Sequence, residues 1–157
     1  MDKDTISGYV RQFHGPLFRL AYSYVRNRED AEDITQEAFM RLLRSEKSFP
    51  SDEDAKAWLM RVTINLSKDI LKSRWRTGRD ELSEDIPCST KEEYAVQECI
   101  SRLEPMYRGI LHLFCYEGYS VKEIASICRI SRTAVTTRLS RARKQLKAML
   151  TDEERKD

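Results

Sequence analysis

The chain has 157 residues, of which 40% are hydrophobic and 34% are charged, and its formal net charge is +2 at pH 7. Leu, Ile, Ala, Arg, Lys and Glu are frequent, whereas there are only five Gly and four Pro, a composition that favours helices over sheets. No segment approaches the roughly 20 consecutive apolar residues that a membrane-spanning helix requires, and the polar first residues predict no signal peptide.

The first half of the chain predicts three helices. Apolar residues recur at helical spacing from residue 9 to 25, with a break expected at Gly15-Pro16, where a fresh helix would begin. A second helix is expected over residues 30–45, after the polar turn RNRED. The segment EKSFPSDEDAKA predicts a loop, followed by a third helix that would bury Trp58, become strongly basic and end near Gly78.

An acidic segment, DELSEDIPCSTKEE, follows the third helix and has no periodic apolar residues. Its composition is typical of a flexible linker. We therefore place a first domain over residues 1–79, the linker over 80–93 and a second domain over 94–157. Each half alone is near the lower size limit for burying an adequate core.

The second half predicts a helix near residues 94–103 and another opened by Pro105. Ser120 and Glu123 form a capping box, S-x-x-E, that begins a helix with the sequence VKEIASI. A tight turn, CRI, separates it from a last helix capped by Ser131, in which apolar residues repeat from Val135 at four-three-four spacing. The sequence thus predicts an all-α fold of two small helical domains, the second a helix-turn-helix domain.

The last helix is basic throughout. Between residues 129 and 147 every charged side chain is Arg or Lys, so no carboxylate would face the phosphates of DNA. In a helix-turn-helix the second helix enters the major groove, where Arg, Lys, Thr and Ser contact base edges and phosphates. If Val135 and Leu139 face the core, the outward side chains are Arg132, Thr136, Thr137, Ser140, Arg141 and Lys144.

Charge is segregated elsewhere too. Residues 61–79 carry six basic side chains against the single acid Asp69, which indicates a second contact with a polyanion. The segment NREDAEDITQE is acidic instead, and Asp30, Asp33 and Glu37 are spaced to lie on one helix face. Acids in a first helical turn also interact favourably with the helix dipole, which explains Asp30 without any partner. Two surfaces of opposite charge suggest two different partners.

Three motifs in this order resemble bacterial RNA polymerase sigma factors of the small, extracytoplasmic-function (ECF) type. LFRLAYSYVRNREDAEDITQEAFMRLL resembles the core-polymerase-binding segment of sigma region two, and AWLMRVTINLSKDILKSRWR is similar to the region-two helix that reads the minus-ten element. LEPMYRGILHLFCYEGYSVKEIASICRISRTAVTTRLSRARKQL is similar to region four, which reads the minus-thirty-five element. The resemblance implies a transcription initiation factor that directs core polymerase to promoters and assists strand opening.

The resemblance also implies which residues contact each partner. The acidic helix would dock on a coiled coil of the largest polymerase subunit through Asp30, Asp33, Gln36, Glu37 and Phe39. Contacts with the minus-ten element would come from Lys56, Arg61, Asn65, Lys68, Lys72, Arg74 and Arg76. Asn65 would lie near a flipped base, in a pocket shaped by the loop from residue 48 to 57. Trp75 could stack on a base. Contacts with the minus-thirty-five element would come from Arg132, Thr136, Thr137, Arg138, Ser140, Arg141, Arg143 and Lys144.

The family resemblance implies three further partners, which are the polymerase flap, promoter DNA and an anti-sigma factor. It also implies a cytoplasmic location, where the anti-sigma factor could hold the protein at the membrane. The sequence departs from the family pattern at Arg129, where Gly is common. A left-handed conformation there would cost roughly 1 kcal/mol.

Two alternatives remain open on the residues alone. A helix-turn-helix regulator acting alone on duplex operators would account for residues 120–150 but leaves the first half without a role. An enzyme is not indicated, because His14 and His112 lie in different halves and no glycine-rich phosphate loop is present. The four cysteines contain no C-x-x-C pair, so we expect no metal and no cofactor.

Overall fold

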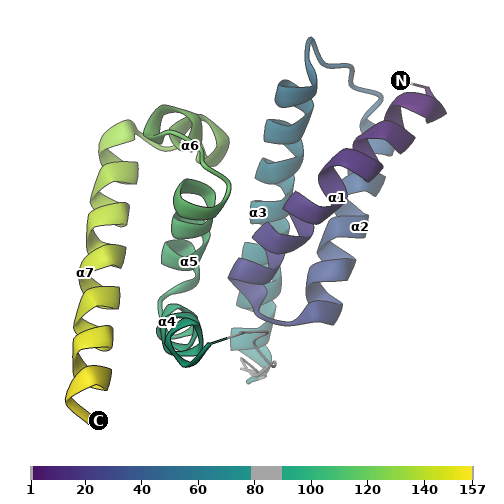
Figure 1. Ribbon diagram of the computed structural model, residues 1–157. Coiled ribbons are helices and arrows are strands. Elements are labelled where there is room, and N and C mark those ends of the chain that lie inside the picture. The colour runs from purple at the N-terminus through teal and green to yellow at the C-terminus, as the bar shows by residue number, and fades with distance from the viewer. Residues whose placement is uncertain (1, 79–89, 157) are drawn as a thin grey trace. The chain divides into compact units, whose positions relative to one another are not determined.

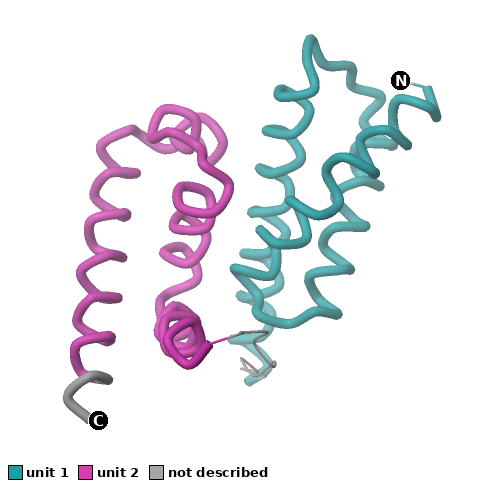
Figure 2. Tube along the Cα trace, in the orientation of Figure 1, with its two compact units in different colours: residues 1–81 teal, residues 82–157 magenta. Residues whose placement is uncertain are grey.

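The computed structural model describes residues 2–78 and 90–156, the last four by their helical backbone alone. The chain divides into two compact units, Met1–Glu81 and Leu82–Asp157 (Figure 2). Every regular element of the described residues is helical, which confirms the predicted all-α fold in two helical units. The predicted linker lies outside the described residues except for residues 90–93, where the next helix already begins at Lys91.

Three helices form the first unit: α1 (Lys3–Val25), α2 (Arg28–Ser45) and α3 (Asp52–Thr77). Each packs against the other two, as Figure 1 shows. The core between them contains the fully buried side chains of Leu17, Leu20, Leu42, Leu59 and Met60. Burial of these apolar side chains on one face of each helix is the main stabilisation of the unit.

Polar caps fix where the helices of the first unit begin. The side chain of Asn27 accepts a hydrogen bond from the backbone N–H of Asp30 at 2.9 Å, and that of Ser51 accepts one from Asp54 at 3.2 Å. Such caps satisfy N–H groups that have no partner within the helix. At the other end of α3, Gly78 adopts a left-handed conformation with φ of 70° and ends the helix, as predicted.

The expected break at Gly15-Pro16 is wrong, because α1 continues through Pro16 as one helix of 23 residues. Proline inside a helix removes one backbone hydrogen bond and costs about 3 kcal/mol. Phe13, Leu17 and Leu20 lie on both sides of Pro16 and are all buried. We attribute the continuity of α1 to this shared buried face, which packs on both α2 and α3.

The loop predicted over residues 46–57 is shorter than expected, since α3 begins at Asp52. The cap from Ser51 and three acids in the first turn, which favour the positive end of the helix dipole, explain the earlier start. Trp58 is half-buried rather than buried in the core. Its ring contacts Phe49 at 5.9 Å between centroids, and the ammonium of Lys47 lies 5.5 Å from the centre of the same ring.

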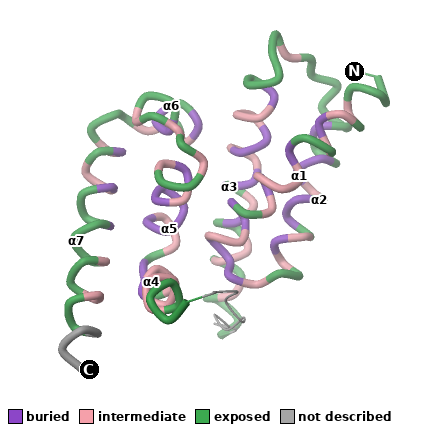
Figure 3. The backbone as a smooth tube through the Cα atoms, in the orientation of Figure 1, coloured by how far each residue is buried: buried purple, intermediate pink, exposed green. Residues whose placement is uncertain are grey.

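The second unit contains α4 (Lys91–Ser101), α5 (Pro105–Leu111), a π-helical turn η1 (His112–Tyr116), α6 (Val121–Cys128) and α7 (Arg132–Lys156). Helix α7 packs against α4, α5 and α6. In the part of α7 whose burial the structure describes, Figure 3 shows the buried positions in the first half of the helix, where Val135 and Leu139 join the core as predicted, together with Ala142. The helix-turn-helix formed by α6 and α7 is therefore held by its own small core.

Local geometry at the helix-turn-helix follows the sequence closely. The hydroxyl of Ser120 accepts from the N–H of Glu123 at 3.1 Å, and the Glu123 carboxylate accepts from the N–H of Ser120 at 3.0 Å. This reciprocal pair is the predicted capping box. Arg129 ends α6 in a left-handed conformation with φ of 56°, and Ser131 caps α7 by accepting from Ala134 at 3.0 Å.

Candidate nucleic-acid interface

The outer face of α7 is the first candidate surface. Because Val135, Leu139 and Ala142 occupy the core, the side chains of Arg132, Thr136, Ser140, Arg141 and Lys144 are exposed, while Thr137 and Arg138 are half-buried beside them. The structure thus brings the predicted base-reading residues to one exposed side of a single helix. A helix that displays Arg, Lys, Ser and Thr can pair with phosphates and with the edges of bases in a major groove.

Arg143 differs from its neighbours on α7. Its guanidinium lies 5.1 Å from the centre of the Phe114 ring, which belongs to η1. A cation over an aromatic face is stabilised by about 0.5–1 kcal/mol at an exposed site. The contact gives Arg143 a role in joining α7 to η1, in addition to the DNA contact predicted for it.

The basic side of α3 is the second candidate surface. Asn65, Lys68, Lys72 and Arg76 are exposed, and Lys56 and Arg61 are half-buried closer to the start of the helix. Their spacing places an amide and several cations along one side of α3. Such a surface suits a nucleic-acid backbone, with the amide of Asn65 able to pair with a base edge.

Arg74 is placed differently from the other basic residues of α3. Its guanidinium donates to the carbonyl of Val25 at 2.7 Å and forms an ion pair with the carboxylate of Asp30. Its side chain is only 12% exposed. Arg74, predicted to contact DNA, and Asp30, predicted to contact the polymerase, are therefore bound to each other within the first unit. Together they connect the end of α3 with the turn between α1 and α2.

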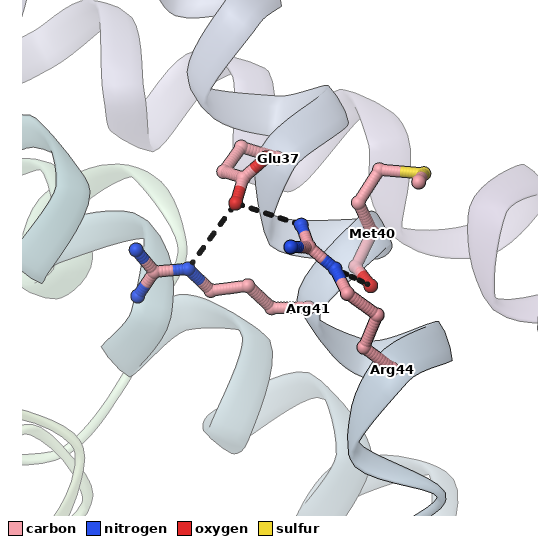
Figure 4. A network of polar contacts seen from close by, with 4 residues as sticks. All are labelled: Glu37, Met40, Arg41 and Arg44. Carbon is pink, nitrogen blue, oxygen red and sulfur yellow. Dashed lines mark hydrogen bonds and ion pairs between the residues drawn. The ribbon is translucent and has the colours of Figure 1, made fainter.

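Helix α2 carries the third candidate surface. Asp33 and Gln36 are exposed, as a partner-binding role requires, whereas the ring of Phe39 is buried. Glu37 lies between two arginines of the same helix, and Figure 4 shows both guanidinium groups directed at one carboxylate oxygen. The distances are 3.4 Å from Arg41 and 2.9 Å from Arg44.

Two exposed apolar residues of α2 were not predicted as part of this surface. Met40 is 48% exposed and Leu43 is 50% exposed, on the helix that also presents Asp33 and Gln36. The run AFMRLL contains more apolar residues than one buried helix face can hold. That excess was the sequence signal for an apolar contact surface.

Comparison with known proteins identifies the family. Residues 9–77 match the model of Sigma-70 region 2, and residues 93–146 match that of Sigma-70, region 4. RNA polymerase sigma factor SigV of Bacillus subtilis is 32% identical over 143 residues, covering 88% of this chain and 86% of SigV. The chain belongs to the RNA polymerase sigma factors of the ECF type.

Other relatives of this sigma factor agree. ECF RNA polymerase sigma factor SigE of Mycolicibacterium smegmatis is 32% identical over 154 residues, which is 90% of this chain but 60% of the length of SigE. Two solved structures share the fold at 22% identity. The sigma factor RpoE in complex with the anti-sigma factor NepR from Bartonella quintana has a TM-score of 0.76 and covers 96% of this chain and 98% of that one. CnrH in complex with the cytosolic domain of CnrY has a TM-score of 0.71, with coverages of 96% and 90%.

Two further features of this sigma factor concern other kinds of site. Among the residues that the structure describes, no helix is long and apolar enough to cross a membrane. Within the same residues, no group of three or more His, Cys, Asp or Glu side chains is placed to hold a metal ion.

Proposed function

We propose that this sigma factor binds core RNA polymerase through α2, contacts the minus-ten element through α3 and contacts the minus-thirty-five element through α7. The observation that carries the proposal is that each matched sigma region presents its own exposed charged surface. Region 2 has the acidic and apolar face of α2 and the basic side of α3, and region 4 has the basic side of α7. The protein acts through binding energy, without catalysing a covalent reaction itself.

The polymerase surface comprises Asp33, Gln36 and Glu37 together with Met40 and Leu43. Carboxylates and an amide at the centre can pair with a basic coiled coil of the largest subunit, and the two apolar side chains add contact area that leaves water on binding. Phe39 supports this face from the core, and Asp30 fixes the start of the helix through Arg74.

The minus-ten surface comprises Lys56, Arg61, Asn65, Lys68, Lys72 and Arg76. The cations follow the phosphate backbone, and Asn65 reads a base that has left the duplex stack. Strand opening is assisted because each unpaired base held by the protein offsets part of the cost of breaking a base pair. Arg74 contributes indirectly, by holding the end of α3.

The minus-thirty-five surface comprises Arg132, Thr136, Thr137, Arg138, Ser140, Arg141, Arg143 and Lys144. Side chains near the start of a recognition helix lie deepest in the major groove. We assign base reading to Thr136, Thr137, Ser140 and Arg141, and phosphate contacts to the remaining basic residues. The second unit would also contact the polymerase flap.

We further propose a cytoplasmic location and an anti-sigma partner that covers the polymerase and DNA surfaces. RpoE and CnrH, which share the fold, were each solved in complex with a partner, named for RpoE as an anti-sigma factor. We assign polymerase and minus-ten binding to residues 1–79 and minus-thirty-five binding to residues 94–157. Residues 80–93 would serve as the tether between them.

Transcription in vitro tests the function directly. Purified bacterial core polymerase is combined with a pooled library of promoter fragments, with and without this protein. The proposal expects defined start sites only when both proteins are present, and the enriched fragments give the promoter sequence. If nothing initiates while the protein alone shifts particular duplexes, the protein is a stand-alone regulator and the assignment of α2 is wrong.

A further inference from the structure

Glu37 on α2 is held by two arginines of its own helix. The Nε of Arg41 and the Nη2 of Arg44 both donate to Oε1 of Glu37, at 3.4 Å and 2.9 Å (Figure 4). The side chains of Glu37, Arg41 and Arg44 are 41%, 48% and 62% exposed. Ion pairs this open to water contribute little to stability. The stability of the fold therefore gives little reason for placing two cations around one carboxylate.

Much of the hydrogen-bonding capacity of the two arginines is unused. A guanidinium can donate from each of its nitrogens. Arg41 uses only its Nε, and Arg44 uses its Nη2 and its Nε, the latter on the carbonyl of Met40 at 3.3 Å. Within residues 2–78 and 90–152, neither side chain binds a further acceptor. Figure 4 shows the terminal nitrogens of Arg41 directed away from Glu37, so they can bind a second anion.

The two ends of α2 differ in charge. Two guanidinium groups share the carboxylate of Glu37, so the cluster of Glu37, Arg41 and Arg44 keeps a net positive charge. The first turns of the helix are acidic, and the exposed Asp33 lies on the same side as Glu37 and Arg44, at a spacing of four and eleven residues. Met40 is exposed between the negative and the positive end.

A partner that fits this face must carry both signs of charge. A nucleic-acid backbone is negative throughout, so it would be repelled by Asp33. A uniformly basic surface would be repelled by the two arginines. A protein helix with a basic side chain opposite Asp33 and a carboxylate opposite Arg44 complements both ends, and apolar side chains between them can cover Met40. Guanidinium groups are well suited to a carboxylate because they can donate two parallel hydrogen bonds to it.

We propose that Arg41 and Arg44 form a binding site for a carboxylate of the polymerase coiled coil, about 16 Å along α2 from the basic side chains that contact Asp33. The proposal rests on the proposed function and adds a site for a negative group to its polymerase surface. Glu37 holds the two guanidinium groups together before the partner binds, so less conformational entropy is lost on binding. The order of charges also determines in which direction the coiled coil runs along α2.

Equilibrium binding of the full chain to purified core polymerase tests the site. We compare Arg41→Gln/Arg44→Gln, Glu37→Ala and all three substitutions together. Arg11→Gln is the matched control, because Arg11 is exposed on α1 and its Nε also donates to the carbonyl four residues earlier. The double glutamine variant should bind about tenfold more weakly than wild type, the scale of losing hydrogen bonds between charged groups. The same loss should appear in the Glu37→Ala background, and Arg11→Gln should bind as wild type.

A charge swap then identifies the partner group. Arg41→Glu/Arg44→Glu should bind more weakly than the double glutamine variant, because its carboxylates repel that of the partner. Replacing one Asp or Glu of the coiled coil by Lys should restore most of the affinity of this glutamate variant. The same replacement should not restore the affinity of Asp33→Lys.

Other results of these measurements would overturn the proposal. If the double glutamine substitution weakens binding only when Glu37 is present, the arginines merely position Glu37. Tighter binding of the double glutamine variant means that the arginines oppose a basic surface, and unchanged binding means that they contact no carboxylate of the polymerase. If polymerase affinity is unchanged but the holoenzyme binds promoter DNA more weakly, the anion is a phosphate of DNA.

Two outcomes concern the partner itself. If no replacement in the coiled coil restores binding of Arg41→Glu/Arg44→Glu, the carboxylate does not belong to the coiled coil and the proposal is wrong. If the wild-type chain does not bind core polymerase at all, the proposed function itself fails.

Discussion

Arg74 of α3 and Asp30 of α2 form an ion pair across the first unit, and the same guanidinium donates to the carbonyl of Val25 at the end of α1. One side chain thereby links all three helices. The side chain of Arg74 is 12% exposed and that of Asp30 is 31% exposed, so the pair is partly shielded from water. Charged hydrogen bonds in such a setting contribute more than those on an open surface.

Arg74→Ala is therefore expected to act on stability. We expect the free energy of unfolding of the first unit to fall by about 1–3 kcal/mol, because Asp30 and the Val25 carbonyl lose their partner. Urea denaturation followed by NMR signals from α1 and α3 measures the loss. Arg76→Ala, two residues further along α3 and exposed, should change stability by less than about 0.5 kcal/mol. A double-mutant cycle of Arg74→Ala and Asp30→Asn should show that their effects on the free energy of unfolding are not additive.

Substitutions on the two charged surfaces should separate two activities. Arg141→Ala should weaken promoter binding by the holoenzyme about tenfold while leaving polymerase affinity unchanged. Asp33→Ala should weaken polymerase binding and leave promoter preference unchanged. Both side chains are exposed, so neither change should alter the melting temperature appreciably. If both variants lost only thermal stability, the division into a polymerase surface and a DNA surface would be wrong.

The apolar part of the α2 face gives an independent prediction. Leu43→Gln should reduce polymerase affinity about tenfold, since glutamine loses the favourable transfer of the half-exposed leucine side chain from water into the interface. Stability of the free protein should be unchanged. Equilibrium binding to core polymerase tests this, with Gln12→Ala, at an exposed position of α1, as the control. If both variants bound core polymerase equally well, Leu43 would not belong to the polymerase surface.

Glu123 predicts a pH dependence for the helix-turn-helix. Hydrogen bonds from the backbone and side chain of Ser120 hold the pKa of the Glu123 carboxyl below its ordinary value of 4.5. A depressed folded-state pKa gives stability that is fully present above the unfolded value and is lost as pH falls through the folded one. The stability advantage of wild type over Glu123→Gln should therefore shrink as the pH falls below about 4.5.

Urea denaturation at several pH values, followed by NMR signals from α6, measures this difference. Glutamine can still accept the hydrogen bond from the Ser120 N–H, so the comparison isolates the charge. Glu123→Ala should be less stable than Glu123→Gln at every pH. A difference between wild type and Glu123→Gln that stays constant from pH 6 to pH 3 would contradict the assignment.

Arg129 offers a stabilising substitution. It ends α6 with φ of 56°, a conformation that costs a non-glycine residue roughly 1 kcal/mol or more. Arg129→Gly should raise the stability of the second unit by up to about 1 kcal/mol, reduced by the greater freedom of glycine in the unfolded chain. Arg129→Ala should give no such gain because alanine keeps the strain. Thermal unfolding followed by signals from α6 and α7 distinguishes the three proteins, and a less stable glycine variant would refute the prediction.

Local sequence patterns were sufficient for most of the fold. The cap at Ser131, the capping box of Ser120 and Glu123, and the periodic Val135, Leu139 and Ala142 depend on neighbours a few residues away, and all are confirmed. The continuity of α1 through Pro16 depends on packing against two other helices. The cost of a proline inside a helix is local to Pro16. The packing of α1 against α2 and α3, which the sequence of α1 alone does not show, outweighs that cost.

The surfaces were harder to predict, because charge patterns do not reveal which charges meet. Arg74 resembles Lys72 and Arg76 in the sequence, yet only Arg74 reaches a carboxylate 44 residues away. Phe39 and Met40 are adjacent apolar residues of α2, and only their position on the helix determines that one is buried and the other exposed. The residue-by-residue assignment of polymerase and DNA contacts stays a prediction until the variants are measured.

The π-helical turn of η1 has a consequence for comparing this protein with its relatives. The N–H of Glu117 donates to the carbonyl of His112, five residues back, at 3.0 Å, whereas an α-helical turn would close over four. The segment therefore accommodates one residue more than a regular helix, and deleting a single residue there would restore α-helical closure and rotate Tyr116 relative to α5. A homologue that lacks this residue should therefore be aligned with a one-residue gap inside residues 112–116.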